Sequence, residues 1–271
     1  MFDAELQRIR AFRERAGGLM VCAGAGMGVD SGLPDFRGDA GFWRAYPPYA
    51  KLGLSFVELA NPAWFRRDPA FAWGFYGHRL ELYRRTVPHA GFGLLSRWGS
   101  AMKHGAFVFT SNVDGQFQRA GFDSERILEA HGAIDFLQCT RGCFGIFPAD
   151  PFRVEVDEGT MRAREPLPSC AKCGALARPN ILMFGDGEWD AARAEAQQEN
   201  LGRWLDGLGD APLLVVECGA GSAVPTVRHF SDRLARRKDA LLVRLNPREP
   251  EVPPGHIGLT LGALEGLRAL A

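Results

Sequence analysis

Short, uninterrupted runs of aliphatic and β-branched residues recur along the chain, and they restrict its fold more than any other feature. They are mostly too continuous for strands with one exposed face, where polar residues would alternate, so we expect buried parallel strands. Segments of helical length separate them, among them Ala90–Met102 and Trp189–Leu208. This alternation predicts a doubly wound, Rossmann-like α/β sheet. The predicted strands are Leu19–Ala23, Ala106–Thr110, Arg126–Ala130, Leu213–Glu217 and Leu241–Leu245.

Two regions interrupt this alternation. From Gly38 to about Arg85 the chain is rich in aromatic residues and proline, which predicts a loop followed by a helical module. The segment from 135 to 180 holds four of the six cysteines and little periodic pattern, which predicts an insert held together by a metal. We therefore expect a discontinuous α/β domain of residues 1–38, 86–134 and 181–271, a loop and helical module of residues 39–85, and an insert of residues 135–180.

Composition limits the partners that the chain can have. Lys and Arg together number 32, as do Asp and Glu, so no overall field attracts nucleic acid or an anionic membrane. No stretch approaches the roughly 18 consecutive apolar residues of a membrane-spanning helix, and the first residues lack the apolar centre of a signal peptide. We therefore expect a cytoplasmic protein with no nucleic-acid or membrane partner, and we expect it to be a monomer.

Four cysteines form two close pairs, Cys139-x₃-Cys143 and Cys170-x₂-Cys173, with 26 residues between the pairs. This spacing is typical of a tetrahedral zinc site. The alternative, four unrelated buried thiols, requires two close pairs to arise by chance in a chain with only six cysteines. Because four thiolates leave no open coordination position, such a metal is structural and not catalytic.

A glycine-rich segment, Gly24-Ala25-Gly26-Met27-Gly28, follows the first predicted strand. Glycines at such a turn let the backbone approach a phosphate, although a tight strand-to-helix turn is the alternative interpretation. After five further residues comes the run Pro34-Asp35-Phe36-Arg37-Gly38, which suits no helix interior. A carboxylate, a ring and a cation in succession suit a lid over the reactive sugar of a bound dinucleotide.

Polar residues follow two other predicted strands. Asn112 and Asp114 come after Ala106–Thr110, and His131 comes after Arg126–Ala130. Because the carboxyl ends of parallel strands meet at one edge of a sheet, we expect these side chains to converge on one crevice. A histidine with a pKa near neutral suits the removal of a proton from a sugar hydroxyl. A backbone-capping turn is the alternative for Asn112 and Asp114, and the other histidines are expected to be structural.

These segments occur in the order found in the sirtuins, the NAD-dependent protein deacylases, and the chain resembles a bacterial-type member. Residues 24–38, GAGMGVDSGLPDFRG, are similar to the family signature. The sequence Thr110-Ser111-Asn112-Val113-Asp114 resembles T-Q-N-[IV]-D, His131-Gly132 the catalytic H-G, and the cysteine pairs the zinc ribbon. The stretch from Arg178 to Asp186 is similar to R-P-x-V-V-x-F-G-E. The resemblance spans about residue 17 to at least residue 250.

The resemblance implies NAD as a co-substrate, one structural zinc and an acylated protein lysine as substrate. The products would be nicotinamide, free lysine and O-acyl-ADP-ribose, with His131 activating a ribose hydroxyl beside Asn112 and Asp114. Phe184 and Gly185 would contact the substrate. The implied cofactor-binding residues are Gly24, Ala25, Gly26, Asp35, Phe36, Arg37, Ser111, Asn112, Val113, Asp114, Gly219, Ala220, Gly221, Ser222 and Asn246.

Tyr76 and Arg79 lie three residues apart and would share one face of a helix. They resemble the Tyr-x-x-Arg pair of the sirtuin branch that removes succinyl, malonyl or glutaryl groups, which implies a grip on the acyl carboxylate. In the alternative interpretation, Tyr76 packs in the core and Arg79 lies on a solvated face near Glu81.

The chain also departs from the family pattern. Gly28 replaces the common Ser, Ser111 replaces Gln, Phe117 replaces His and Asp186 replaces Glu. Because the histidine and the Asn/Asp pair remain, we expect the chemistry to persist with altered affinity for NAD. A protein mono-ADP-ribosyltransferase and a non-catalytic NAD sensor of the same fold are the alternatives, and the balanced charge disfavours a zinc-ribbon nucleic-acid binder.

Overall fold

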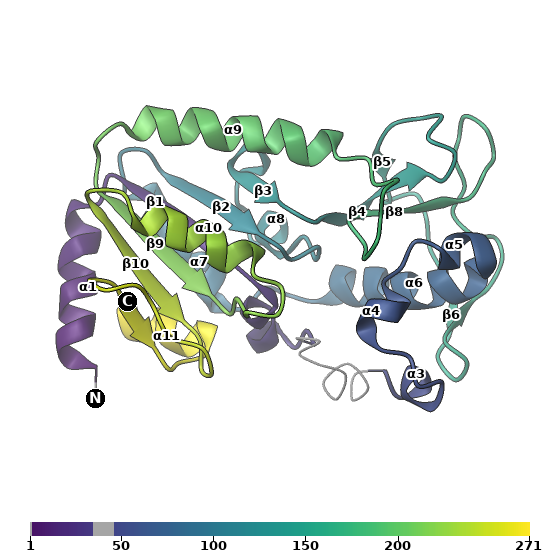
Figure 1. The fold of residues 1–271 in the computed structure, drawn as a ribbon, viewed down its shortest axis with the longest axis horizontal. Helices are drawn as coiled ribbons and strands as arrows, with labels where there is room; N and C mark the ends of the chain where they lie inside the picture. Colours follow the sequence, from purple (N-terminus) through teal and green to yellow (C-terminus); the bar gives the residue numbers. More distant parts are fainter. Residues whose placement is uncertain (1, 35–45) are drawn as a thin grey trace.

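The computed structural model describes residues 2–34 and 46–271, and its centre is a six-stranded parallel sheet (Figure 1). All five predicted strands are present, with bounds shifted by at most one residue. The short strand β11 was missed, because it spans only three residues after a proline-rich segment. The strand order is β11-β10-β9-β1-β2-β3, with β1 Gly18–Ala23, β2 Ala106–Thr110, β3 Ile127–Glu129, β9 Leu213–Cys218, β10 Ala240–Leu245 and β11 Ile257–Leu259.

Helices cover both faces of this sheet, as a doubly wound fold requires. In β1, Leu19 and Val21 belong to one core cluster, whereas Met20 and Cys22 belong to another. The first cluster contains residues of α1 (Asp3–Arg15), α7 (Ala90–Ser100) and α11 (Ala263–Leu270), and the second contains residues of α9 (Ala192–Leu208) and α10 (Thr226–Ala235). Successive strand residues therefore face opposite helical layers, which explains the uninterrupted apolar runs.

Two predicted helices are shorter in the structure than in the sequence pattern. Helix α9 begins at Ala192 and not at Trp189, because the Asp190 side chain accepts the Ala192 N–H at 3.1 Å and ends the preceding turn. Helix α7 ends at Ser100, after which a turn containing Gly105, with φ of +71°, leads into β2.

The described parts of the two interruptions, residues 46–85 and 135–180, form one smaller lobe beside the sheet, on the right in Figure 1. Its helices are α3 (Pro47–Lys51), α4 (Phe56–Leu59), α5 (Trp64–Arg67) and α6 (Pro69–Arg85). Its antiparallel strands pair as β5-β4-β8 and as β6-β7, with β4 Gly132–Cys139, β5 Phe147–Pro148, β6 Val156–Asp157, β7 Arg162–Ala163 and β8 Ala177–Ile181. Trp73 and Tyr76 of α6 share a buried cluster with Ile134 and Leu137 of β4, so the helical module and the cysteine-bearing insert have a common core.

The division of the chain into domains remains a prediction. Strands β4 and β8 cross its borders at 134/135 and 180/181. Across residues 2–34 and 46–271, no helix combines the length and the apolar character needed to cross a membrane.

Candidate functional site

The glycine-rich loop after β1 is held against the loop after β9. It forms two single turns, η1 (Ala25–Met27) and η2 (Val29–Ser31), in place of a long helix. The N–H of Gly24 donates to the Cys218 carbonyl and that of Gly26 to the Gly219 carbonyl, both at 3.0 Å. A Cβ on Gly24 would lie 2.7 Å from the Ala220 Cα, and a Cβ on Gly219, whose φ is +62°, would lie 2.4 Å from the Gly26 backbone. These glycines are therefore needed for the close approach of two loops predicted to bind the cofactor.

The loop after β2 joins the same edge of the sheet. The Thr110 hydroxyl donates to the Ala23 carbonyl at 2.9 Å, and the Ser111 N–H donates to the same oxygen at 3.2 Å. The side-chain amide of Asn112 donates to the Gly24 carbonyl at 3.0 Å. Asn112 is thus held beside the glycine-rich loop.

Asp114 is buried at the start of α8 (Gln116–Arg119). Its Oδ1 accepts the Gln116 N–H at 3.0 Å, so the predicted alternative of a capping turn describes its backbone correctly. Burial, and then the charge of Glu129, raise the pKa of Asp114 to about 6, while the bond from Gln116 and the charges of Arg119 and Arg79 lower it. A carboxyl that changes protonation near neutral pH is unusual and is typical of functional sites.

His131 lies at the junction of the two lobes, between β3 and β4. The next residue, Gly132, has a φ of +75°, and a Cβ there would lie 2.0 Å from the Asn180 carbonyl oxygen of β8. The His131 carbonyl accepts the Leu182 N–H at 3.0 Å, and its Nε2 lies 3.2 Å from the Thr226 hydroxyl. Burial lowers the pKa of His131, so the imidazole is neutral at pH 7 and able to accept a proton.

Asn246 follows β10 and joins the other loops at this edge. Its Nδ2 donates to the Ala220 carbonyl at 2.8 Å, and its Oδ1 accepts the backbone N–H groups of Arg248 at 3.0 Å and Glu249 at 3.1 Å. The Glu249 carboxylate accepts the Ser222 N–H at 2.8 Å. These bonds link the loop after β9 to the turn after β10, and Asn246 itself is fully buried.

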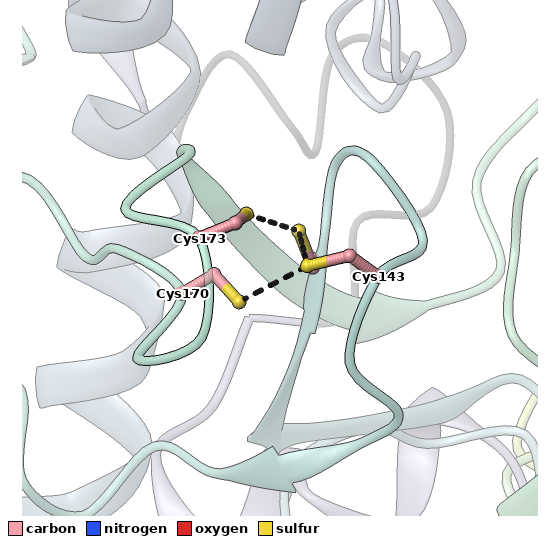
Figure 2. A group of neighbouring side chains, drawn as sticks. Cys143, Cys170 and Cys173 are labelled. Carbon is pink, nitrogen blue, oxygen red and sulfur yellow. Dashed lines mark hydrogen bonds between the residues drawn. The ribbon is translucent and has the colours of Figure 1, made fainter.

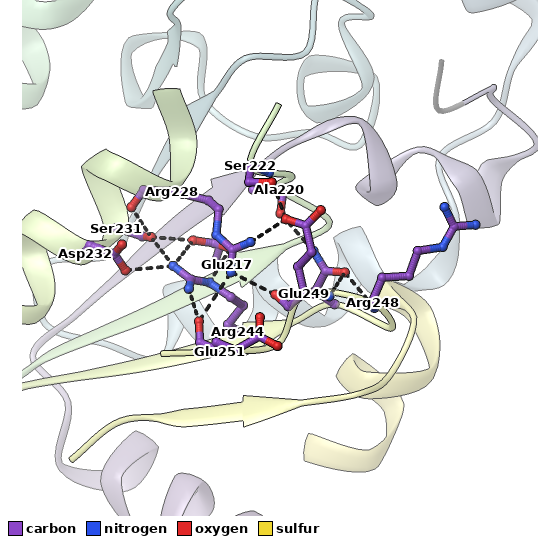
Figure 3. A network of polar contacts seen from close by, with 11 residues as sticks. Glu217, Ala220, Ser222, Arg228, Ser231, Asp232, Arg244, Arg248, Glu249 and Glu251 are labelled. Atoms are coloured by element: carbon purple, nitrogen blue, oxygen red, sulfur yellow. Dashed lines mark hydrogen bonds and ion pairs between the residues drawn. The ribbon is translucent and has the colours of Figure 1, made fainter. Parts of the chain in front are cut away.

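A buried ion pair beneath these loops was not predicted from the sequence (Figure 3). The Arg244 Nε donates to Glu217 Oε1 at 2.6 Å, and its Nη2 donates to the Asp232 carboxylate at 2.8 Å. The side chains of Arg244 and Glu217 are 2% and 0% exposed. The pair connects β9, β10 and α10, the three elements that carry the 219–222 loop and Asn246.

Tyr76 and Arg79 are both buried on α6. The expected alternative was right that Tyr76 packs in the core, where its ring stacks on Phe65 at a centroid distance of 5.7 Å. It was wrong for Arg79, which is 7% exposed and lies among the rings of α6. Arg79 Nε and Nη2 donate to the Tyr83 hydroxyl at 3.0 and 2.7 Å. Arg79 is thus a buried cation among the aromatic rings of α6.

Phe184 and Gly185 lie on a loop after β8 that a buried ion pair closes. Arg178 and Asp186 form two parallel hydrogen bonds of 2.7 and 2.9 Å, and their side chains are 2% and 0% exposed. The Phe184 N–H donates to the Ala60 carbonyl at 2.9 Å. The ring centroids of Phe184 and Phe56 are 6.0 Å apart. Phe184 is 38% exposed, so this loop presents an apolar surface beside α4.

The four predicted zinc ligands are brought together in the smaller lobe (Figure 2). Their sulfur atoms all lie within 4.8 Å of one another, with Sγ distances of 3.5 Å between Cys139 and Cys143 and 3.7 Å between Cys143 and Cys170 and between Cys139 and Cys173. A tetrahedron of Zn–S bonds of about 2.3 Å has sulfur–sulfur edges of about 3.8 Å. The donor set and its spacing therefore fit a structural zinc ion.

The structure describes two further predicted site residues. Val113 is buried, and its carbonyl accepts the Ile134 N–H of β4 at 2.9 Å. A Cβ added at Gly221 would meet nothing within 4 Å. Three others, Asp35, Phe36 and Arg37, lie outside the described residues.

Comparison with known proteins places this arrangement in a family. The model described as "Sir2 family" matches residues 24–201. The chain is 31% identical over 236 residues to NAD-dependent protein deacylase 2 of Pyrobaculum aerophilum, covering 87% of this chain and 82% of the relative. It is 31% identical over 279 residues to an NAD-dependent protein deacylase of Thermus thermophilus, covering 98% of this chain and 93% of the relative.

Solved structures agree with this assignment. A Sir2 homologue in complex with NAD superposes with a TM-score of 0.73 at 25% identity, covering 100% of this chain and 92% of the other. A structure described under the mechanism and regulation of Sir2 enzymes gives a TM-score of 0.68 at 25% identity, covering 100% and 97%. The chain belongs to the Sir2 family, the sirtuins.

Proposed function

We propose that this chain is an NAD-dependent protein-lysine deacylase that acts on acidic acyl groups. The observation that carries the proposal is that Asn112 and buried Asp114 follow β2 and neutral His131 follows β3 at one edge of the parallel sheet, with Asn112 bonded to the glycine-rich loop. A crevice outside the carboxyl ends of parallel strands is where such sheets bind nucleotides. Relatives named as NAD-dependent protein deacylases support the same activity.

The residues at this edge suit NAD. A Cβ added at Gly221 would meet nothing within 4 Å, so the loop after β9 borders open space there, whereas Gly24 lies too close to that loop to carry a side chain. When bound, NAD supplies a ribose carbon that takes the acyl oxygen and releases nicotinamide. In this proposal, Asp114 shapes the nicotinamide pocket and Asn112 holds the adjacent ribose or a water. His131, neutral at pH 7, accepts the proton of a ribose hydroxyl.

The substrate assignment rests on two features of the smaller lobe. Leu182 and Phe184 are exposed apolar residues on the loop after β8, where an extended peptide with an acylated lysine would bind. Arg79 lies among aromatic rings, with its guanidinium carbon 5.1 Å from the Phe75 ring centroid and 5.3 Å from that of Tyr83. A guanidinium in such surroundings gains more from a carboxylate than from a neutral acetyl group.

The proposal is tested by incubating the protein with succinyl-, malonyl- and acetyl-lysine peptides, with and without NAD, and following all products by mass spectrometry. We expect free lysine, nicotinamide and O-acyl-ADP-ribose, with succinyl processed at least as well as acetyl. His131→Ala should lower the rate of deacylation by several orders of magnitude and leave NAD binding intact. Transfer of ADP-ribose to protein would indicate the transferase alternative, and NAD binding without nicotinamide release would indicate a sensor.

Acyl selectivity is tested separately with Arg79→Met. A charge-assisted hydrogen bond contributes about 1.5–3 kcal/mol, so kcat/KM for the succinyl peptide should fall about 10- to 150-fold. The value for the acetyl peptide should change little. Arg85→Met, an exposed position on the same helix, is the matched control. Equal losses on both peptides would leave general deacylation and remove the acid-binding role of Arg79.

A further inference from the structure

Thr226 contacts His131 from a distant part of the chain. Its Oγ1 lies 3.2 Å from the His131 Nε2, and 95 residues separate the two. Thr226 is the first residue of α10, and the N-cap of that helix, Pro225, makes no side-chain capping bond. A threonine hydroxyl near a helix start commonly bonds to a nearby backbone group. The Thr226 hydroxyl instead contacts a histidine on the distant segment between β3 and β4, which requires an explanation.

We propose that Thr226 is a positioning residue for His131, which holds the imidazole in the orientation needed to accept the ribose proton. This inference rests on the proposed function. When the neutral ring carries its proton on Nε2, the Nε2–H donates to the Thr226 oxygen and the Nδ1 lone pair accepts the ribose proton. The contact therefore persists when the ring takes up a proton. A base oriented by a third group is the arrangement that many nucleophile and base pairs use.

Two features around the contact keep the His131 ring neutral. Helix α10 has ten residues, and the partial positive charge at its first turn disfavours an imidazolium nearby. Burial of His131 also favours the neutral ring. The ring thus stays unprotonated before the reaction, and the Thr226 hydroxyl fixes its direction without adding charge. The contact also connects the segment between β9 and α10 to the junction after β3.

The test uses Thr226→Val, which removes the hydroxyl and keeps the shape, and Thr226→Ser, which restores the hydroxyl. Two steps are measured on the full chain. Exchange of labelled nicotinamide into NAD with an acylated peptide reports the step before His131 acts, and O-acyl-ADP-ribose formation reports the step that needs it. His229→Gln, at an exposed position on α10, is the control.

We expect Thr226→Val to slow product formation about fivefold, the loss of one neutral hydrogen bond, and to leave nicotinamide exchange within about twofold of wild type. Thr226→Ser should recover product formation to within about twofold of wild type. Equal rates for Thr226→Val and wild type, or equal losses in both steps, or failure of Thr226→Ser to recover the rate, would overturn the inference. A wild-type protein without deacylation would instead refute the proposed function.

Discussion

The buried ion pair between Arg178 and Asp186 allows a quantitative prediction about the loop after β8 that carries Phe184. Asp186→Asn removes the negative charge and leaves the Arg178 guanidinium, 2% exposed, without its carboxylate. Removing one partner of a buried pair costs about 3–5 kcal/mol, because the remaining charge is still desolvated. For a chain of this length each kcal/mol lowers Tm by about 2 °C, so Tm should fall by about 6–10 °C.

A matched control lies two residues along the chain. Glu188 pairs with Arg66 at 2.7 Å, but these side chains are 63% and 61% exposed. Glu188→Gln makes the same chemical change and should cost less than about 1 kcal/mol. Urea unfolding followed by circular dichroism measures the free energy of unfolding of both variants. The reasoning would be refuted by an Asp186→Asn protein no less stable than Glu188→Gln.

The same substitution has a kinetic consequence. The Asp186 carboxylate also accepts the Met183 N–H at 3.3 Å and the Glu188 N–H at 3.2 Å, so it fixes both sides of the loop that carries Phe184. Its loss should raise KM for an acylated peptide more than it lowers kcat. The double variant Arg178→Met/Asp186→Leu, which removes both charges, should regain most of the stability. A double variant less stable than Asp186→Asn would show that shape, and not charge, dominates there.

Three further outcomes are expected. Metal analysis should find one zinc per chain, and Cys173→Ala, at an exposed position, should lower stability and zinc content together; unchanged stability would exclude a structural zinc. Because burial raises the pKa of Asp114 to about 6, its contribution to stability is present at low pH and is lost as pH rises through about 6. Urea unfolding should therefore show wild type losing stability relative to Asp114→Asn between about pH 4 and 7, and parallel curves would contradict this. Gly219→Ala, whose Cβ would lie 2.4 Å from the Gly26 backbone, should weaken NAD binding measured by calorimetry, and wild-type affinity would show that the two loops separate without cost.

The strands that precede Asn112, Asp114 and His131 could be predicted because each is a single apolar run. That the three side chains meet in one crevice stays a prediction, which rests on the rule that parallel strands end at one edge of a sheet. The four cysteines were predictable for a similar reason, since two short spacings define both halves of the zinc site. Features of this kind depend on local sequence and on one topological rule.

The ion pair of Glu217 and Arg244 was missed although the sequence contains a signal for it. Each residue occupies the fifth position of its strand, in LLVVEC and ALLVRL. Strands β9 and β10 pair in parallel with Glu217 opposite Arg244, so opposite charges at equal positions of two apolar runs are neighbours. A single charge inside a buried run requires a partner, and the adjacent strand is the first place to look for it.

The contact between Thr226 and His131 belongs to another class, for which no such rule exists. The strands before these residues, β9 and β3, are separated in the sheet by β1 and β2, so no register relates them. The contact requires that α10 begin at the carboxyl edge, which the length of the 219–225 loop decides, and that Gly132 turn the chain into the smaller lobe behind His131. Two independent loop geometries must agree for one hydrogen bond to form. The places of Asn112, Asp114 and His131 along the chain therefore follow from the strands, whereas the contact between His131 and Thr226 depends on loops that the sequence pattern does not determine.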